Sequence, residues 1–114
     1  MRPGPHRWTF VAALSLLAWP MAGTAFAQDA TALHARSLAA TCAQCHGTDG
    51  RAPPGSAVPA LAGMAAPYLI EQMQAFKGGA RPGTVMPQLA KGYSDAQIAL
   101  LAGYFAQTAA GARP

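Results

Sequence analysis

The sequence predicts a small all-α domain with about three main helices, and three observations support this prediction. Apolar residues recur at helical spacing in three segments, which are separated by Gly- and Pro-rich stretches. No segment alternates between apolar and polar residues as a half-buried strand would. The length of 114 residues suits one domain, and a composition of 52% hydrophobic and 11% charged residues argues against a disordered chain, a coiled coil or a collagen.

The first 27 residues have the features of a secretory signal peptide. A basic start precedes an apolar run over residues 8–19, and residues 25–27 form an A-x-A cleavage site. The apolar run is too short for a membrane span of about 20 residues. We therefore expect residues 1–27 to be removed on export to the periplasm, residues 28–114 to form one domain, and no membrane span to remain.

The domain that remains is small and weakly charged. It carries six basic and four acidic side chains without a basic run, so it does not resemble a nucleic-acid-binding surface. Three Tyr and two Phe residues provide little material for a core. Domains of this size usually need a disulfide, a metal or a similar support, and the two cysteines are the candidates for providing one.

The first predicted helix covers residues 31–42 and delivers the first cysteine at its end. Its apolar positions fall on one helical face, namely Ala35, Leu38, Ala39 and Cys42. Residues 47–63 follow as a loop rich in Gly and Pro.

The second predicted helix begins near Pro67, since proline suits the first turn of a helix. Leu69, Met73 and Phe76 form its apolar stripe, and the Gly-Gly pair at 78–79 ends it. A second loop with further Gly and Pro residues is expected over residues 80–93.

The third predicted helix begins at Ser94 and fades near residues 108–111. Ser94 and Gln97 have the spacing of a capping box, and Asp95 is favourable near the positive end of the helix dipole. One apolar face follows, formed by Ile98, Leu101, Ala102 and Phe105.

Residues 42–46 read Cys-Ala-Gln-Cys-His, the C-x-x-C-H pattern of c-type haem attachment. Two thiols add to the two vinyl groups of the porphyrin, and Cys42 and Cys45 project to the same side of a helical turn. His46 follows directly, so its imidazole can reach the iron from one face. The motif therefore predicts one haem c, bound covalently through Cys42 and Cys45, with His46 as an axial ligand.

Three other uses of two nearby cysteines fit less well. A dithiol oxidoreductase would place them after a strand in a βαβ unit, and no strand pattern precedes Cys42. A zinc site usually has four ligands, but the sequence has neither a second C-x-x-C pair nor an H-x-x-x-H pattern. A structural disulfide would close a very small loop and leave His46 unexplained.

The second axial ligand is expected to be a methionine, because a thioether raises the reduction potential and suits electron transfer. Met86 is the candidate, since it lies in the second loop, after a helix that lets the chain round the haem edge. Met73 lies on an apolar stripe and is assigned to the core. Met64 is expected to pack or lie at the surface, and His34, the rival for a bis-His site, to be a solvent-exposed histidine.

These residues resemble the class I cytochromes c over residues 28–114. Four stretches are more closely similar to the cytochrome subunit of flavocytochrome c sulfide dehydrogenase: C-A-Q-C-H-G-T-D-G-R at 42–51, P-A-L-A-G at 59–63, F-K-G-G-A-R-P at 76–82 and A-K-G-Y-S-D-A-Q-I-A-L-L-A-G-Y-F at 90–105. The short form of that subunit has one haem, as the single motif does here.

The resemblance also implies roles for single residues. Met86 matches the distal ligand, and Pro59 matches a proline whose carbonyl accepts the Nδ1–H of the proximal histidine, a bond that fixes the ring. Arg81 matches a position close to a haem propionate, with a solvent-exposed charge as the alternative. Tyr104 and Phe105 match aromatic residues that pack on the N-terminal helix.

The predicted function is electron transfer rather than catalysis, because both axial positions of the iron would be filled. The resemblance implies a sulfide-oxidising flavoprotein as partner and a downstream electron carrier. A freely diffusing mono-haem shuttle is one alternative, and a haem-based sensor or ligand-binding module is another. Since Lys77 and Lys91 are the only lysines, we expect an apolar docking surface from residues 43–64 and 83–88 rather than strong electrostatic steering.

Overall fold

The computed structural model describes Met1, Gly4 and residues 22–109 of the chain. The basic start and the apolar run of the predicted signal peptide lie outside these residues. Within the described part of the chain, the secondary structure consists of five α-helices and one short 3₁₀ helix, without a strand. The prediction of an all-α fold is therefore confirmed.

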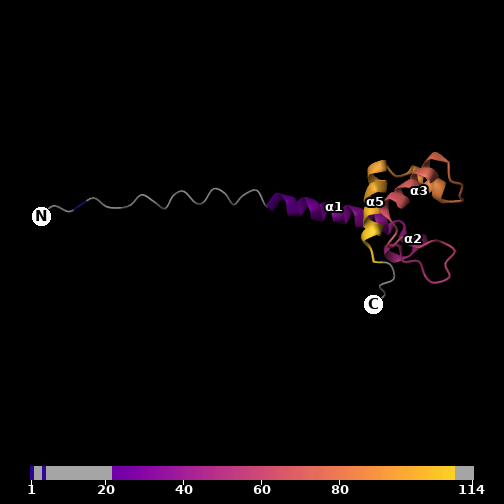
Figure 1. Ribbon diagram of the computed structural model, residues 1–114, viewed down its shortest axis with the longest axis horizontal. Helices are drawn as coiled ribbons and strands as arrows, with labels where there is room; N and C mark the ends of the chain where they lie inside the picture. The colour runs from indigo at the N-terminus through magenta and orange to yellow at the C-terminus, as the bar shows by residue number, and fades with distance from the viewer. Residues whose placement is uncertain (2–3, 5–21, 110–114) are drawn as a thin grey trace.

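The first helix, α1 (Ala22–Ala40), is longer at its start than predicted and ends two residues earlier. Within the described residues the helix extends from Ala22, and the alanine-rich stretch over residues 22–30 contains no proline that would interrupt it. It ends before Cys42 because the Thr41 hydroxyl donates to the Leu38 carbonyl at 2.7 Å and tightens the chain into a turn. The outer half of α1 projects away from the other helices (Figure 1), and its side chains from residue 26 to 34 are exposed.

The helices α3 (Ala66–Gly78) and α5 (Asp95–Gln107) match their predicted positions. Pro67 lies in the first turn of α3, and Gly79 ends that helix in the left-handed conformation at φ 80°. Ser94 caps α5, and its capping box with Gln97 is complete. Residues at the helix ends therefore determine where α3 and α5 begin and end.

The short helix α4 (Met86–Lys91) lies inside the segment predicted as a loop over residues 80–93. Pro87 occupies its first turn, and the amides of Gln88 and Leu89 both donate to the Val85 carbonyl. A helix of six residues is too short to show the periodicity on which the sequence prediction depends. This correction places Met86 at a helix start rather than in an irregular loop.

The core lies where α1 and α3 pack against α5, and α4 packs against α3. Its buried residues come from all four helices: Ala39, Leu69, Met73, Ala90, Ile98, Leu101, Ala102 and Phe105. The predicted apolar face of α5 is confirmed, since Ile98, Leu101 and Phe105 are almost fully buried. None of the helices in the described segments is long and apolar enough to span a membrane.

Candidate functional site

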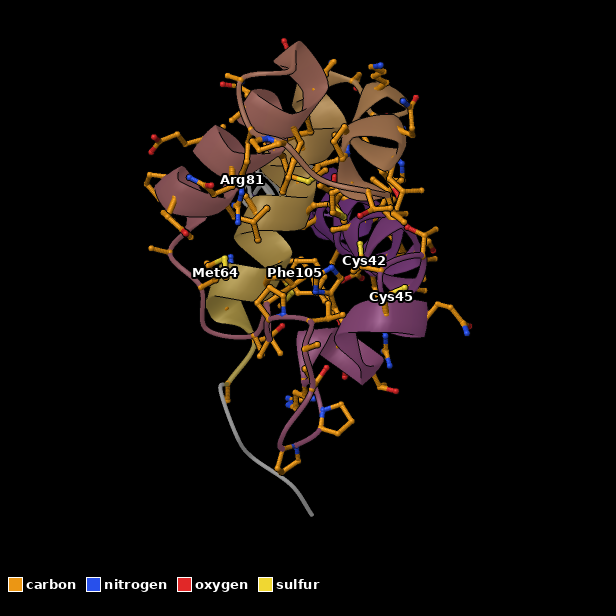
Figure 2. All side chains as sticks on the ribbon, turned by 90° about the vertical axis from the view of Figure 1, so that its right-hand side faces the viewer. Cys42, Cys45, Met64, Arg81 and Phe105 are labelled. Atoms are coloured by element: carbon orange, nitrogen blue, oxygen red, sulfur yellow. The ribbon has the colours of Figure 1, made fainter. Side chains whose placement is uncertain are left out.

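Cys42 lies between α1 and the short helix α2 (Ala43–His46), and Cys45 lies within α2. Figure 2 shows both on one side of Phe105, with Met64 and Arg81 on the other side. Cys42 is half-buried and packs against the core, whereas Cys45 is exposed, and the two do not form a disulfide. Burial raises the pKa of the Cys42 thiol, although a hydrogen bond with Thr41 acts in the opposite direction.

His46 is the one buried polar side chain of the described core, with 9% of its surface exposed. Its Nδ1 lies 2.8 Å from the carbonyl oxygen of Pro59, so Nδ1 carries the hydrogen and donates it. The backbone amide of His46 donates to the Cys42 carbonyl at 2.9 Å. The Pro59 contact fixes the orientation of the imidazole, and Nε2 is left with its lone pair for a metal ion.

The chain after His46 turns sharply, and two glycines make this turn possible. Gly47 adopts φ 80°, and a Cβ on it would lie 2.3 Å from the carbonyl oxygen of Arg51. The 3₁₀ helix η1 (Thr48–Gly50) follows, and a Cβ on Gly50 would lie 2.9 Å from the Phe105 ring. The chain can therefore pass close to α5 before it returns to Pro59.

The methionines differ in burial. Met73 is buried in the core, as predicted, while Met64 and Met86 are half-buried and pack against it. His34 is exposed on α1, as predicted. Met86 opens α4 directly after the exposed Val85, so its position is set by a helix start.

Arg81 is exposed and bound to α3. Its guanidinium lies 4.5 Å from the centre of the Phe76 ring and donates to the side-chain carbonyl of Gln72. Its backbone amide donates to the Ala75 carbonyl at 3.0 Å. The structure thus gives Arg81 protein partners on α3, and its role toward a propionate stays a prediction.

Two tyrosine hydroxyl contacts were not predicted from the sequence. The Thr41 hydroxyl donates to Leu38, so Tyr93 donates to Thr41, and the two oxygens are 2.6 Å apart. The hydroxyl of Tyr104 donates to Asp49 Oδ1, also at 2.6 Å. Their partners lie 52 and 55 residues away along the chain, and no local pattern connects them.

The residues around His46 fit a covalently bound haem. Two cysteines without a disulfide between them stand three positions apart, and the imidazole beside them presents Nε2. Half-buried Met86 offers a thioether sulfur, a ligand that suits haem iron together with histidine. Within residues 22–109, no three His, Cys, Asp or Glu side chains gather to hold a metal ion.

Comparison with known proteins identifies the family of this chain. The family described as Cytochrome c matches residues 32–109. The cytochrome subunit of sulfide dehydrogenase from Chlorobaculum tepidum is 43% identical over 68 residues, which cover 60% of this chain and 60% of that protein. The thiosulfate dehydrogenase electron acceptor of Thiomonas intermedia is 40% identical over 76 residues, or 67% of this chain and 35% of that protein.

A solved structure shows the same fold. Thiosulfate dehydrogenase from Marichromatium purpuratum matches with a TM-score of 0.62 and 29% identity, covering 72% of this chain and 20% of that chain. The chain thus spans about a third to three-fifths of the length of the two curated relatives above. The match over residues 32–109, with the C-x-x-C-H motif inside it, shows that this chain is a member of the cytochrome c family, of class I, and carries haem c bound covalently through Cys42 and Cys45.

Proposed function

We propose that this cytochrome carries single electrons and is not itself an enzyme, with His46 and Met86 as the axial ligands of the iron. Haem c supplies the one-electron Fe(III)/Fe(II) couple. The hydrogen bond from His46 Nδ1 to the Pro59 carbonyl, at 2.8 Å, is the observation that carries the proposal. It fixes the ring, selects Nε2 as the ligand atom and increases its basicity.

Met86 completes the coordination in this proposal. A filled sixth position leaves no site on the iron for a substrate, which separates an electron carrier from a haem enzyme or a sensor. Met86 is half-buried at the start of α4 and packs against the same core as Cys42.

The test of the ligand is the substitution Met86→Ala. We expect loss of the thioether charge-transfer band in the near-infrared spectrum of the ferric protein, a lower reduction potential, and binding of added ligands such as imidazole. Met64→Ala and Met73→Ala are the matched controls and should keep the band. Loss of the band in Met64→Ala, or a high-spin ferric spectrum in the unmodified protein, would contradict the proposal, and the high-spin spectrum would favour a sensor.

We propose further that the electron donor is a dehydrogenase of reduced sulfur compounds, with a flavoprotein that oxidises sulfide as the first candidate. The relatives are described as the cytochrome subunit of sulfide dehydrogenase and as a thiosulfate dehydrogenase electron acceptor. A downstream carrier would then take the electron on. Cleavage after Ala27 and a periplasmic location are part of the same proposal, supported by the signal-peptide pattern.

The partner is proposed to dock on residues 43–64 and 83–88, beside the attachment site. This region is largely uncharged, and Cys45, Ala57 and Val85 are exposed on it. We expect electron transfer from the partner to depend only weakly on ionic strength, because few charges face the contact. Ala57→Glu and Met64→Glu should slow the transfer, while Ala32→Glu on the projecting part of α1 should not.

Isolation from the native host distinguishes a subunit from a freely diffusing shuttle. If this cytochrome is a subunit, a flavin-containing chain should co-purify with it. A cytochrome that purifies alone and still accepts electrons from the flavoprotein would favour the shuttle. A steep salt dependence together with silent Ala57 and Met64 substitutions would contradict the proposed docking surface.

A further inference from the structure

The C-terminal helix α5 is joined to the loop that follows His46 by a hydrogen bond outside the haem ligands. Tyr104 donates to Asp49 Oδ1 at 2.6 Å, and Arg51 donates to Oδ2 of the same carboxylate at 3.1 Å. Asp49 has φ 54° and ψ 27°, and among the described residues it is the one non-glycine residue with positive φ. Such a conformation persists where the surroundings hold it, and both carboxylate oxygens are held here.

The next residue transmits this position to the chain around Pro59. The carbonyl oxygen of Gly50 accepts hydrogen bonds from the amides of Leu61, at 2.8 Å, and Ala62, at 3.1 Å. Pro59 lies two residues before Leu61 on this short stretch of chain. Pro59 is thus two residues away from a segment that the Gly50 carbonyl holds.

A second contact with α5 closes the loop. The Gly63 amide donates to the Phe105 carbonyl at 2.9 Å, and Phe105 is the residue after Tyr104. The loop from 47 to 63 is thus attached to α5 at both ends, through Asp49 and through Gly63. Pro59, whose carbonyl holds His46, lies between these attachments.

We propose that Tyr104 is a positioning residue for His46. By holding Asp49, its hydroxyl fixes the Gly50 carbonyl, the Leu61–Ala62 segment and hence the carbonyl that accepts the His46 Nδ1–H. This proposal rests on the proposed role of His46 as an axial ligand. In this proposal, the orientation of the imidazole depends on the C-terminal helix as well as on the neighbouring loop. Tyr104 lies 58 residues after His46 along the chain.

The experiment compares hydrogen exchange in the reduced holo-protein of the original sequence and of Tyr104→Phe. We expect the Leu61 and Ala62 amides and the His46 Nδ1–H to exchange about tenfold faster in the variant, since a hydrogen bond to a charged acceptor is lost. Amides in the middle of α3 should keep their rates. A purely structural role for Tyr104 would speed exchange across the whole domain instead.

Tyr93→Phe is the matched control. It removes a hydroxyl hydrogen bond of the same 2.6 Å length, but its partner is Thr41, outside the 47–63 loop. Exchange at Leu61, Ala62 and His46 should be unchanged in this variant. Asp49→Asn retains an acceptor oxygen for Tyr104 but loses the charge, so its exchange at these positions should lie between that of the original protein and that of Tyr104→Phe.

Asp49→Gly provides a second route if Tyr104→Phe yields no holo-protein, because glycine tolerates the positive φ while the acceptor is lost. It should reproduce the faster exchange at the same three positions. Unchanged rates in either variant, or a uniform increase over all helices, would overturn the proposal. The thioether band of the ferric spectrum is recorded in parallel, so failure of the His/Met assignment is seen separately.

Discussion

At the scale of single residues, Asp49 links the stability of the fold to pH. The hydrogen bond from Tyr104 is the largest cause that lowers the pKa of the Asp49 carboxyl, and the Arg51 and Arg36 charges act in the same direction. Because the folded-state pKa lies below the unfolded one, this stabilisation is present above the ordinary carboxyl pKa. It is lost as the pH falls through the folded-state value.

We therefore expect Asp49→Asn to make the stability of the holo-protein less dependent on pH in the acid range. The measurement is the free energy of unfolding in denaturant at several pH values between about 3 and 6. Glu71→Gln on the exposed face of α3 serves as the control and should keep the original slope. Identical slopes for all three proteins would contradict the role given to Asp49.

The Tyr104 hydroxyl makes stability depend on pH in the alkaline range. The same hydrogen bond is the largest cause that raises the pKa of Tyr104 above its ordinary value. Its stabilisation is therefore complete below the ordinary tyrosine pKa and is lost as the pH rises through the folded-state value.

Alanine substitutions at Gly50 and Gly55 allow the cost of overpacking to be distinguished from the cost of backbone strain. Both have positive φ, 74° and 79°, but a Cβ on Gly50 would meet Phe105 and Leu61 at 2.9 Å, while a Cβ on Gly55 would meet nothing within 4 Å. We expect Gly55→Ala to cost about 1–2 kcal/mol of unfolding free energy from strain alone. Gly50→Ala should cost about 1–3 kcal/mol more, through overpacking.

Denaturant unfolding of both holo-proteins measures this difference. Equal losses of stability in Gly50→Ala and Gly55→Ala would show that Phe105 and Leu61 move aside at little cost. Such a result would contradict the tight contact between η1 and α5.

The attachment residues could be predicted from the sequence because their chemistry depends on local spacing. Cys42, Cys45 and His46 lie within five residues and form one motif. The Tyr104–Asp49 and Tyr93–Thr41 hydrogen bonds join residues 55 and 52 positions apart, so only the packing of the helices brings them together. The bond between His46 and Pro59 was expected from the family resemblance, and the structure contains it.

At the scale of helices, the N-terminal cap of α5 makes a measurable contribution to the free energy of unfolding. The Ser94 side chain accepts a hydrogen bond from the Gln97 amide, and the Gln97 side chain accepts one from the Ser94 amide. Ser94→Ala removes the first of these and should cost about 1 kcal/mol of unfolding free energy. Thr31→Ala, which removes a hydroxyl from the exposed part of α1, should change it by less than about 0.5 kcal/mol.

Thermal or denaturant unfolding of the two variants provides the comparison. If Ser94→Ala were as silent as Thr31→Ala, α5 would be fixed by its buried face alone. That face includes Ile98, Leu101 and Phe105, which are almost fully buried.

The helix boundaries were predictable where the sequence has a specific end signal. Pro67, Gly79 and Ser94 mark the ends of α3 and α5 through their own backbone preferences. No such signal separates residues 22–31 from the rest of α1, and α4 is too short for a periodic pattern. The boundary of α1 and the presence of α4 were therefore mispredicted because chain continuity or tertiary packing, rather than a local end signal, determines them.

At the scale of the whole molecule, the protein core is small. Of the ten buried apolar residues in the described part of the chain, five are alanines, and the largest fully buried side chains are Phe105, Ile98 and Leu101. Such a core stabilises a domain only marginally, so a bound prosthetic group would supply a large part of the apolar interior.

We expect Cys42→Ala to leave the haem attached through one thioether or lost, with a large loss of helical structure whenever the haem is lost. Circular dichroism and absorbance of the purified variant measure helix content and haem together. A haem-free variant with full helix content and a cooperative unfolding transition would show that the polypeptide core is sufficient by itself.

The projecting part of α1 bears on the proposed cleavage after Ala27. Ala27 lies inside this helix, so removal of residues 1–27 would place a new amino terminus at Gln28, within a helical segment. The α-amino group carries positive charge at neutral pH and would oppose the positive end of the helix dipole. Asp29, the next residue, supplies a negative charge at that end and offsets the new one, so processing would leave the exported helix with its own electrostatic cap.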